Sequence, residues 1–126
     1  MTTVLIVDDS KLARIVAAKA LTALQPHWQR VEATNAEEAL TIMAERPADV
    51  ALLDYNMPGR NGLELAADLR ALHPAMPIAI ITANVQDEVV AQARAVGAAF
   101  VGKPLTQDGL RGFLSGAALR LRVPGQ

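Results

Sequence analysis

Two kinds of segment alternate five times along the chain, and this alternation restricts the fold more than any other feature of the sequence. The first kind is a short apolar run rich in β-branched residues. These runs lie at Val4–Val7, Arg30–Ala33, Val50–Leu53, Ile78–Ile81 and Ala99–Val101. A longer Ala- and Leu-rich stretch with helical spacing follows each of them. Five strand-then-helix units joined by short loops predict an α/β fold, with an open parallel sheet and helices on both of its faces.

The predicted strands differ in how deeply they should be buried. Val4–Val7, Val50–Leu53 and Ile78–Ile81 are apolar at every position, which is typical of strands covered on both faces. The run Arg30–Ala33 carries charges and Ala99–Val101 is short, so we expect both at the edges of the sheet.

The helical stretches carry start and stop signals. Asn35 with Glu38, and Asn61 with Glu64, have the spacing of an N-cap and a capping box. The expected stops are Pro26, Pro47 and Pro74 for the first three helices and Gly97 for the fourth. In the first helix, the apolar stripe that should face the core is Leu12, Ile15, Val16, Ala20 and Ala23, with Lys19 as its one polar interruption.

Composition excludes several classes of function. The chain is 52% hydrophobic and 20% charged, which is typical of a globular protein with a sizeable core. Its net charge is −1, aromatic residues make up only 3%, and no basic run is present, so we expect no direct DNA binding. The absence of cysteine excludes disulfides and thiolate metal sites, and is in keeping with a cytoplasmic location.

We expect one domain over residues 1–122 and a short C-terminal tail at 123–126. The first apolar run ends at Asp8, too soon for a signal peptide. No uninterrupted apolar run is long enough to cross a bilayer. The sequence therefore predicts no membrane association.

Polar side chains follow four of the five predicted strands. Asp8 and Asp9 come after the first strand, Asp54 after the third, Thr82 after the fourth and Lys103 after the fifth. Ligands of open α/β sheets bind outside the carboxyl ends of the strands. We therefore expect three carboxylates, one hydroxyl and one ammonium group to meet at a single edge of the sheet.

Taken singly, each of these residues has an ordinary structural explanation as a cap, a turn or a loop residue. Together, Asp8, Asp9 and Asp54 repel one another unless a cation compensates their charge. Mg²⁺ is the simplest candidate, since it prefers oxygen ligands and needs few carboxylates. One aspartate is then left to act as a nucleophile, while Lys103 and Thr82 hold the oxygens of an anionic group.

Four strings of residues carry a family resemblance. VLIVDDS (Val4–Ser10), LLDYNMPGRNG (Leu53–Gly62), ITAN (Ile81–Asn84) and FVGKP (Phe100–Pro104) stand in order along the chain. Each string alone is unspecific, but the ordered set resembles the receiver domain of two-component response regulators in its stand-alone, chemotaxis-type form. This resemblance covers essentially the whole chain and implies a flavodoxin-like fold with strand order 2-1-3-4-5.

The resemblance also implies the chemistry of the site. Asp54 would accept a phosphoryl group from the phosphohistidine of a sensor histidine kinase or of a histidine phosphotransfer protein. Asp8, Asp9, Asp54 and the backbone carbonyl of Asn56 would bind Mg²⁺. The chain would act as a switch in a phosphorelay and not as a turnover enzyme.

Further roles follow from the same resemblance. Lys103 and Thr82 would hold the phosphoryl oxygens, and Ala83 would leave access to them open. Phe100 matches the aromatic switch position, although it lacks the hydroxyl of a tyrosine. The peptide bond before Pro104 would be cis.

The output surface of similar proteins is formed by the fourth helix, the fifth strand and the last helix. A downstream output protein would bind there, and a homodimer could form through the same face. Gly109, Gly112 and Gly116 recur on one stripe of the last helix. Two interpretations of this stripe stay open: an intrinsically weak helix, or a surface that a partner approaches closely.

Alternative functions are weighed against the receiver. A flavodoxin-like cofactor binder needs a first loop that cradles phosphate, whereas Asp8 and Asp9 repel it. A phosphatase with an aspartate nucleophile would carry a second acid where Asn56 stands. A pseudo-receiver that binds partners without being phosphorylated is disfavoured because all five expected site residues are present. A colourless protein and a mass shift with a small phosphodonor would separate a receiver from the cofactor binder, and absence of the shift would favour the pseudo-receiver.

Overall fold

The computed structural model describes residues 2–83 and 86–122. Asn84 and the expected tail at 123–126 lie outside the described residues. Strands and helices alternate along the chain as predicted: β1 (Thr3–Val7), α1 (Lys11–Leu24), β2 (Gln29–Ala33), α2 (Ala36–Glu45), β3 (Val50–Asp54), α3 (Gly62–Leu72), β4 (Ile78–Thr82), α4 (Asp87–Ala95), β5 (Ala99–Gly102) and α5 (Gln107–Arg122).

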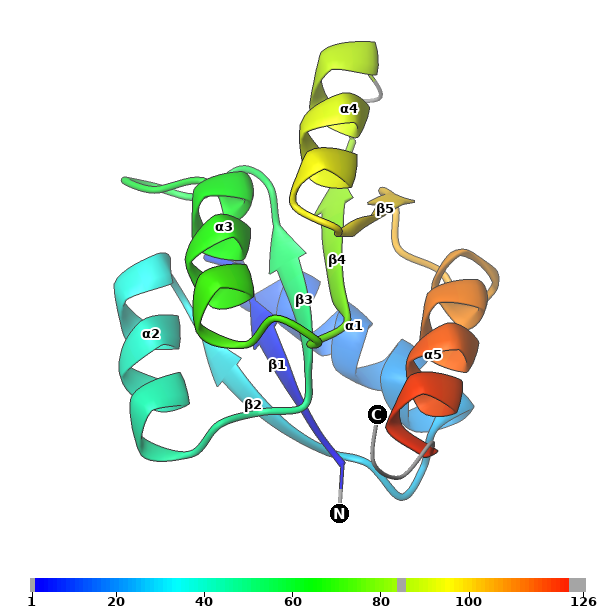
Figure 1. Cartoon of the computed structure of the whole chain (residues 1–126). Coiled ribbons are helices and arrows are strands. Elements are labelled where there is room, and N and C mark those ends of the chain that lie inside the picture. The colour runs from blue at the N-terminus through cyan, green and yellow to red at the C-terminus, as the bar shows by residue number, and fades with distance from the viewer. Residues whose placement is uncertain (1, 84–85, 123–126) are drawn as a thin grey trace.

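The strands form one parallel sheet in the order β2-β1-β3-β4-β5. This confirms the flavodoxin-like order 2-1-3-4-5 and places β2 and β5 at the edges. Successive residues of β1 face opposite layers of the molecule. Leu5 and Val7 pack with α2, α3 and α4, while Val4 and Ile6 pack with α1 and α5. Figure 1 shows α3 in front of the sheet and α1 behind it.

The buried face of α1 is not the one expected from its sequence. Leu12 is 70% exposed, and Ile15 and Val16 are exposed as well. Ala20 is buried as expected, but the residues that α1 buries beside it are Ala17, Ala18 and Leu21, none of which was in the expected stripe. Both stripes are apolar, so periodicity alone does not choose between them. The stripe with Ala17, Ala18 and Ala20 faces the core because small side chains let α1 pack closely against the sheet and α5.

The predicted helix boundaries are confirmed. The side chain of Asn61 accepts a hydrogen bond from the backbone N–H of Glu64, and the Glu64 side chain accepts one from the Asn61 N–H, each at 2.9 Å. Asn35 caps α2 in the same way, but the Glu38 side chain accepts from the N–H of Thr34 and not from Asn35. The helices α1, α2 and α3 each end just before the predicted proline, and Gly97 follows α4 at φ +69°.

Arg70 joins the C-terminal ends of α3 and α4. Its guanidinium donates to the carbonyl of Val96 at 3.0 Å and to that of Gly97 at 2.9 Å. It also donates to the carbonyls of Met76 at 2.7 Å and Pro74 at 2.9 Å. One partly buried cation therefore satisfies several carbonyls after two helix ends and ties α4 to α3.

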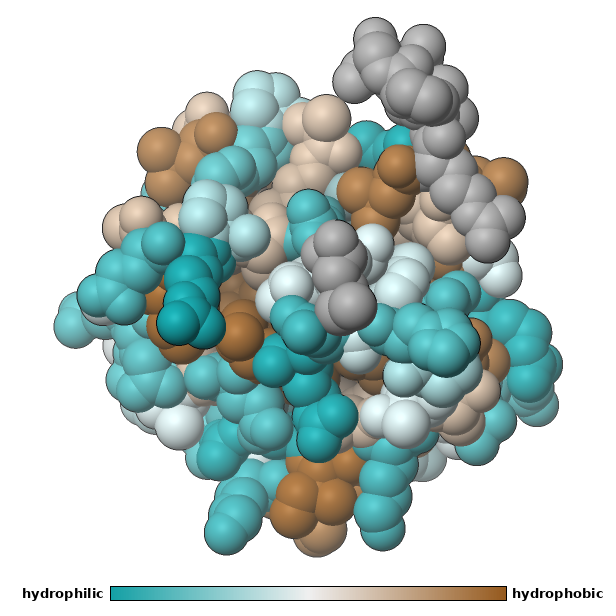
Figure 2. Space-filling view, turned by 90° about the horizontal axis from the view of Figure 1, so that it is seen from below, coloured by the Kyte–Doolittle hydropathy of each residue, from teal (hydrophilic) through white to brown (hydrophobic). Residues whose placement is uncertain are grey.

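The surface mixes polar and apolar side chains. On the face that Figure 2 shows, hydrophobic atoms form separate clusters between hydrophilic side chains. The large apolar side chains that stay exposed are Leu12, Ile15, Val16, Leu72, Leu119 and Leu121. Among the described residues, no helix is both long and apolar enough to span a membrane.

Gly62 lets α3 begin directly against the end of β3. A Cβ atom at this position would lie 2.3 Å from the backbone oxygen of Asp54 and 3.1 Å from the Cα of Tyr55. The N–H of Gly62 donates to the Tyr55 carbonyl at 3.0 Å. Any side chain at position 62 therefore displaces the backbone that carries Asp54.

We predict that Gly62→Ala lowers the free energy of unfolding by about 1–3 kcal/mol, because the contact is with backbone atoms that cannot rotate away. Gly112→Ala is the matched control, since a Cβ at position 112 meets nothing within 4 Å. This control should raise stability by about 1 kcal/mol. Urea unfolding followed by the fluorescence of Trp28, which packs on the core, measures both changes. Equal effects of the two substitutions would contradict the close approach.

Candidate functional site

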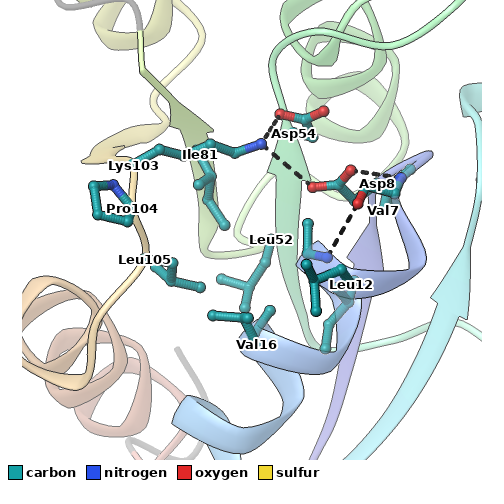
Figure 3. A pocket seen from close by; sticks show the side chains of 14 residues that line it. Val7, Asp8, Leu12, Val16, Leu52, Asp54, Ile81, Lys103, Pro104 and Leu105 are labelled. Atoms are coloured by element: carbon teal, nitrogen blue, oxygen red, sulfur yellow. Dashed lines mark hydrogen bonds and ion pairs between the residues drawn. The ribbon is translucent and has the colours of Figure 1, made fainter.

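The parallel sheet brings the predicted polar residues to one edge. Asp8 follows β1, Asp54 ends β3, Thr82 ends β4 and Lys103 follows β5. Figure 3 shows the Lys103 side chain reaching from the end of β5 across the sheet edge to Asp54 and Asp8. Four residues that are distant in sequence thus meet because their strands point in the same direction.

Three carboxylates lie together at this edge. One oxygen each of Asp8, Asp9 and Asp54 fall within 4.8 Å of one another. Asp8 and Asp54 are only 7% and 4% exposed, whereas Asp9 is exposed to solvent. The Nζ of Lys103 lies 3.0 Å from Oδ1 of Asp54 and 3.6 Å from Oδ2 of Asp8. The cluster therefore has more negative than positive charge.

Burial and charge shift the pKa values of the central pair. Burial raises the pKa of Asp54, as does the neighbouring Asp8 carboxylate, and the hydrogen bond from Lys103 offsets only part of this rise. Burial lowers the pKa of Lys103, but the Asp54 and Asp8 carboxylates outweigh this and raise it. The ammonium form of Lys103 is thus favoured, while Lys103 only partly offsets the cost of burying the negative charge of Asp54 beside Asp8.

The donor set fits a hard divalent cation. Oδ1 of Asp54 is buried and, apart from its ion pair with Lys103, has no hydrogen-bond partner among the described residues. Carboxylate oxygens grouped around such an atom are the ligands that Mg²⁺ prefers. Asp8, Asp9 and Asp54 are the residues that could hold the ion. The backbone of Asn56 lies close enough to Asp54 to lower its pKa by a hydrogen bond, so Asn56 borders the same place.

The remaining predicted residues surround this cluster. Thr82 is buried, and its backbone carbonyl accepts a hydrogen bond from the N–H of Lys103 at 2.9 Å. Ala83, which follows it, is exposed. Phe100 is partly buried on β5 and pairs with Ile80, two residues before Thr82 on the neighbouring strand. The peptide bond between Lys103 and Pro104 is cis, as expected.

A cavity of about 240 Å³ lies beneath the charged cluster. Its apolar walls include Leu12, Val16, Leu52 and Leu105, which Figure 3 shows below Asp8 and Lys103. The carboxylates therefore border an apolar hollow that is partly open to solvent at Leu12 and Val16.

Two residues at the site have no role in the sequence analysis. The N–H of Ser10 donates to Oδ1 of Asp8 at 2.9 Å, and its hydroxyl oxygen caps α1 by accepting from Ala13 at 3.2 Å. Arg14 donates to the backbone carbonyl of Asp8 at 2.7 Å. Ser10 could be found as an N-cap residue before a helical stretch. No comparable signal points to Arg14, because its partner at the site is a backbone atom.

This fold and this edge define a known class of protein. The response regulator receiver domain family matches residues 4–115, and the chain belongs to that family. Domains of this family are signalling switches of two-component systems, and they interact with histidine kinases and output partners. The resemblance drawn from the four strings of residues is thereby confirmed.

Particular relatives agree with this assignment. The positive alginate biosynthesis regulatory protein of Pseudomonas aeruginosa is 38% identical, with 95% of this chain covering 48% of that protein. The phosphate regulon transcriptional regulatory protein PhoB of the same organism is 35% identical, with coverages of 98% and 54%. The chain thus spans about half the length of these relatives. The solved structure of the Vibrio cholerae chemotaxis protein CheY4 is similar with a TM-score of 0.83 and 28% identity, over 93% of this chain and 98% of that one.

The raised pKa of Asp54 predicts a pH-dependent effect of Asp54→Asn. Because the pKa is raised in the folded state, Asp54 does not lower the free energy of unfolding at pH values below its ordinary pKa of 3.8. As the pH rises through the folded-state pKa, the group becomes charged and the folded protein loses stability. Without divalent cations, Asp54→Asn should therefore be more stable than the parent protein at about pH 7.5, with the gain shrinking towards about pH 4. Urea unfolding at both pH values measures it.

Asp108→Asn serves as the control, because Asp108 is exposed at the start of α5, where its ion pair is with Arg111 and not with the cluster. It should show no gain that grows with pH. A constant difference between Asp54→Asn and the parent protein across this range would contradict the uncompensated charge at Asp54.

Proposed function

We propose that this chain is a phosphorylation-dependent switch in which Asp54 accepts a phosphoryl group. The donor is the phosphohistidine of a sensor histidine kinase or of a histidine phosphotransfer protein. The observation that carries the proposal is the buried Asp54 carboxylate, paired with Lys103 at 3.0 Å and grouped with Asp8 and Asp9. Membership of the receiver family supports it.

The transfer balances as a simple displacement. A carboxylate oxygen of Asp54 forms a bond to phosphorus while the bond from phosphorus to the donor's imidazole nitrogen breaks, and the electron pair stays on that nitrogen. Lys103 stays an ammonium ion, which its raised pKa favours, and pairs with the phosphoryl oxygens. Thr82 offers its hydroxyl to one of these oxygens. The protein thus contributes mainly positioning and charge compensation.

Mg²⁺ is the cofactor that this site fits, held by the carboxylates of Asp8, Asp9 and Asp54 and the backbone carbonyl of Asn56. When bound, it supplies positive charge that offsets the crowded carboxylates and the phosphoryl oxygens. Ala83, small and exposed, leaves the approach to Asp54 open.

The signal would leave through the face formed by α4, β5 and α5. Phe100 lies on β5, within this face and next to the strand that ends in Thr82, and acts as the aromatic switch that turns when Thr82 engages the phosphoryl group. A downstream output protein binds there, and a homodimer forms through the same face. The chain works in the cytoplasm as a switch and not as a turnover enzyme, and it binds neither DNA nor membrane itself.

The glycines of α5 bear on the same face. A Cβ atom at Gly112 or Gly116 would meet nothing within 4 Å, so both positions are open to solvent. Gly109 is closer to its surroundings, with the Thr106 hydroxyl oxygen 3.3 Å from such an atom. Open space at a glycine accommodates a weak helix and a contact stripe alike, so both interpretations of the stripe stand.

We predict that acetyl phosphate with Mg²⁺ adds one phosphoryl group to the chain, at Asp54. Asp54→Asn should abolish the gain in mass because an amide is not a nucleophile. Intact-mass spectrometry and peptide mapping measure both, with Asp108→Asn as a control that is labelled normally.

Labelling that persists in Asp54→Asn would place the acceptor elsewhere. A parent protein that binds Mg²⁺ but gains no mass would instead be a pseudo-receiver. Either result would overturn the proposed acceptor.

A further inference from the structure

Arg14 connects three parts of the molecule at the candidate site. It lies on α1, its Nη1 donates to the backbone carbonyl of Asp8 at 2.7 Å, and its Nε donates to Oε1 of Glu32 on β2 at 3.0 Å. Only 14% of its side chain is exposed. Two directed hydrogen bonds and its burial hold the Arg14 guanidinium in a single orientation.

The carbonyl that Arg14 binds belongs to the peptide unit between Asp8 and Asp9. Because a peptide unit is planar, fixing the direction of this carbonyl also fixes where the Cα of Asp9 lies, the atom from which its side chain leaves the backbone. The neighbouring hydrogen bonds involve other groups and do not fix this peptide unit: the Asp8 N–H donates to the Ala33 carbonyl, and the Ser10 N–H donates to the Asp8 side chain. Arg14 makes the one bond to this carbonyl that the structure shows within the described residues.

Of the three carboxylates, that of Asp9 depends most on the hydrogen bond from Arg14 to the Asp8 carbonyl. Its carboxylate is exposed, whereas Asp8 and Asp54 are buried and paired with Lys103. An exposed carboxylate in a turn samples several directions unless its backbone is fixed. The geometry therefore makes Arg14 the residue that holds Asp9 towards the other two carboxylates.

We propose that Arg14 is a positioning residue of the metal site, which orients the Asp8–Asp9 peptide unit while Glu32 orients the guanidinium. This inference rests on the proposed Mg²⁺ site. It adds a residue that touches neither the ion nor the phosphoryl group and acts through the backbone of two ligands.

Positioning and charge make opposite predictions for the loss of Arg14. Removing a positive charge beside a cation site favours cation binding, so a purely electrostatic role predicts tighter Mg²⁺ binding in Arg14→Met. A positioning role predicts weaker binding, by about ten- to a hundredfold, as is usual for groups that orient metal ligands. Arg14→Lys keeps the charge but not the two-directional fork, so it should lose affinity as well.

Isothermal titration calorimetry of the metal-free full chain with MgCl₂ measures these affinities. Lys11→Met is the matched control, since Lys11 is an exposed cation at the start of the same helix; its affinity should be unchanged or slightly higher. Glu32→Gln keeps a hydrogen-bond acceptor and should lose less affinity than Arg14→Met. Thermal unfolding of each metal-free variant, run in parallel, shows that the titrated protein is folded.

A merely structural Arg14 would lower the melting temperature and leave the Mg²⁺ affinity of the folded variants unchanged, which would overturn the inference. Unchanged or tighter binding in Arg14→Lys overturns it also if Arg14→Met fails to fold. Failure of the proposed function looks different: the parent protein itself would then bind no Mg²⁺.

Discussion

The mutual repulsion of three carboxylates is the interaction on which the rest of the site depends. The parallel sheet places Asp8, Asp9 and Asp54 within 4.8 Å of one another, and only Lys103 among the described residues forms an ion pair with them. Burial deepens the imbalance, because it raises the pKa of Asp54. The folded chain thus holds a cluster of carboxylates whose mutual repulsion a divalent cation, or neutralisation of the charge on Asp54, would relieve.

The residues around the cluster hold it together against that repulsion. Gly62 lets α3 begin against the backbone of Asp54, at a distance that no side chain tolerates. Arg14 and Ser10 fix the turn after β1, one by its bond to the Asp8 carbonyl and the other by its bond to the Asp8 side chain. Arg70 ties the C-terminal end of α4 to α3, at the edge of the sheet away from the site.

Much of this arrangement could be predicted from the sequence, because edge strands and polar strand ends are properties of pattern and the full strand order follows from the family resemblance. Asp54 and Lys103 meet because parallel strands share a carboxyl edge, which needs no knowledge of side-chain contacts. The buried face of α1 was predicted wrongly, since Leu12 and Ala17 lie on two stripes that are equally apolar and only packing chooses between them. The sequence does not predict the roles of Arg14 and Arg70, because the bonds through which they act go to backbone carbonyls, and every residue type carries a carbonyl.

The coupling between charge repulsion and metal binding can be measured through Asp9. Urea unfolding of the parent chain and of Asp9→Asn, each with and without Mg²⁺, gives four free energies of unfolding. Without the ion, Asp9→Asn should be at least as stable as the parent because repulsion is relieved; with it, the parent should gain stability by mass action and the variant little. A variant that is less stable without Mg²⁺ and gains as much from it as the parent would contradict this account.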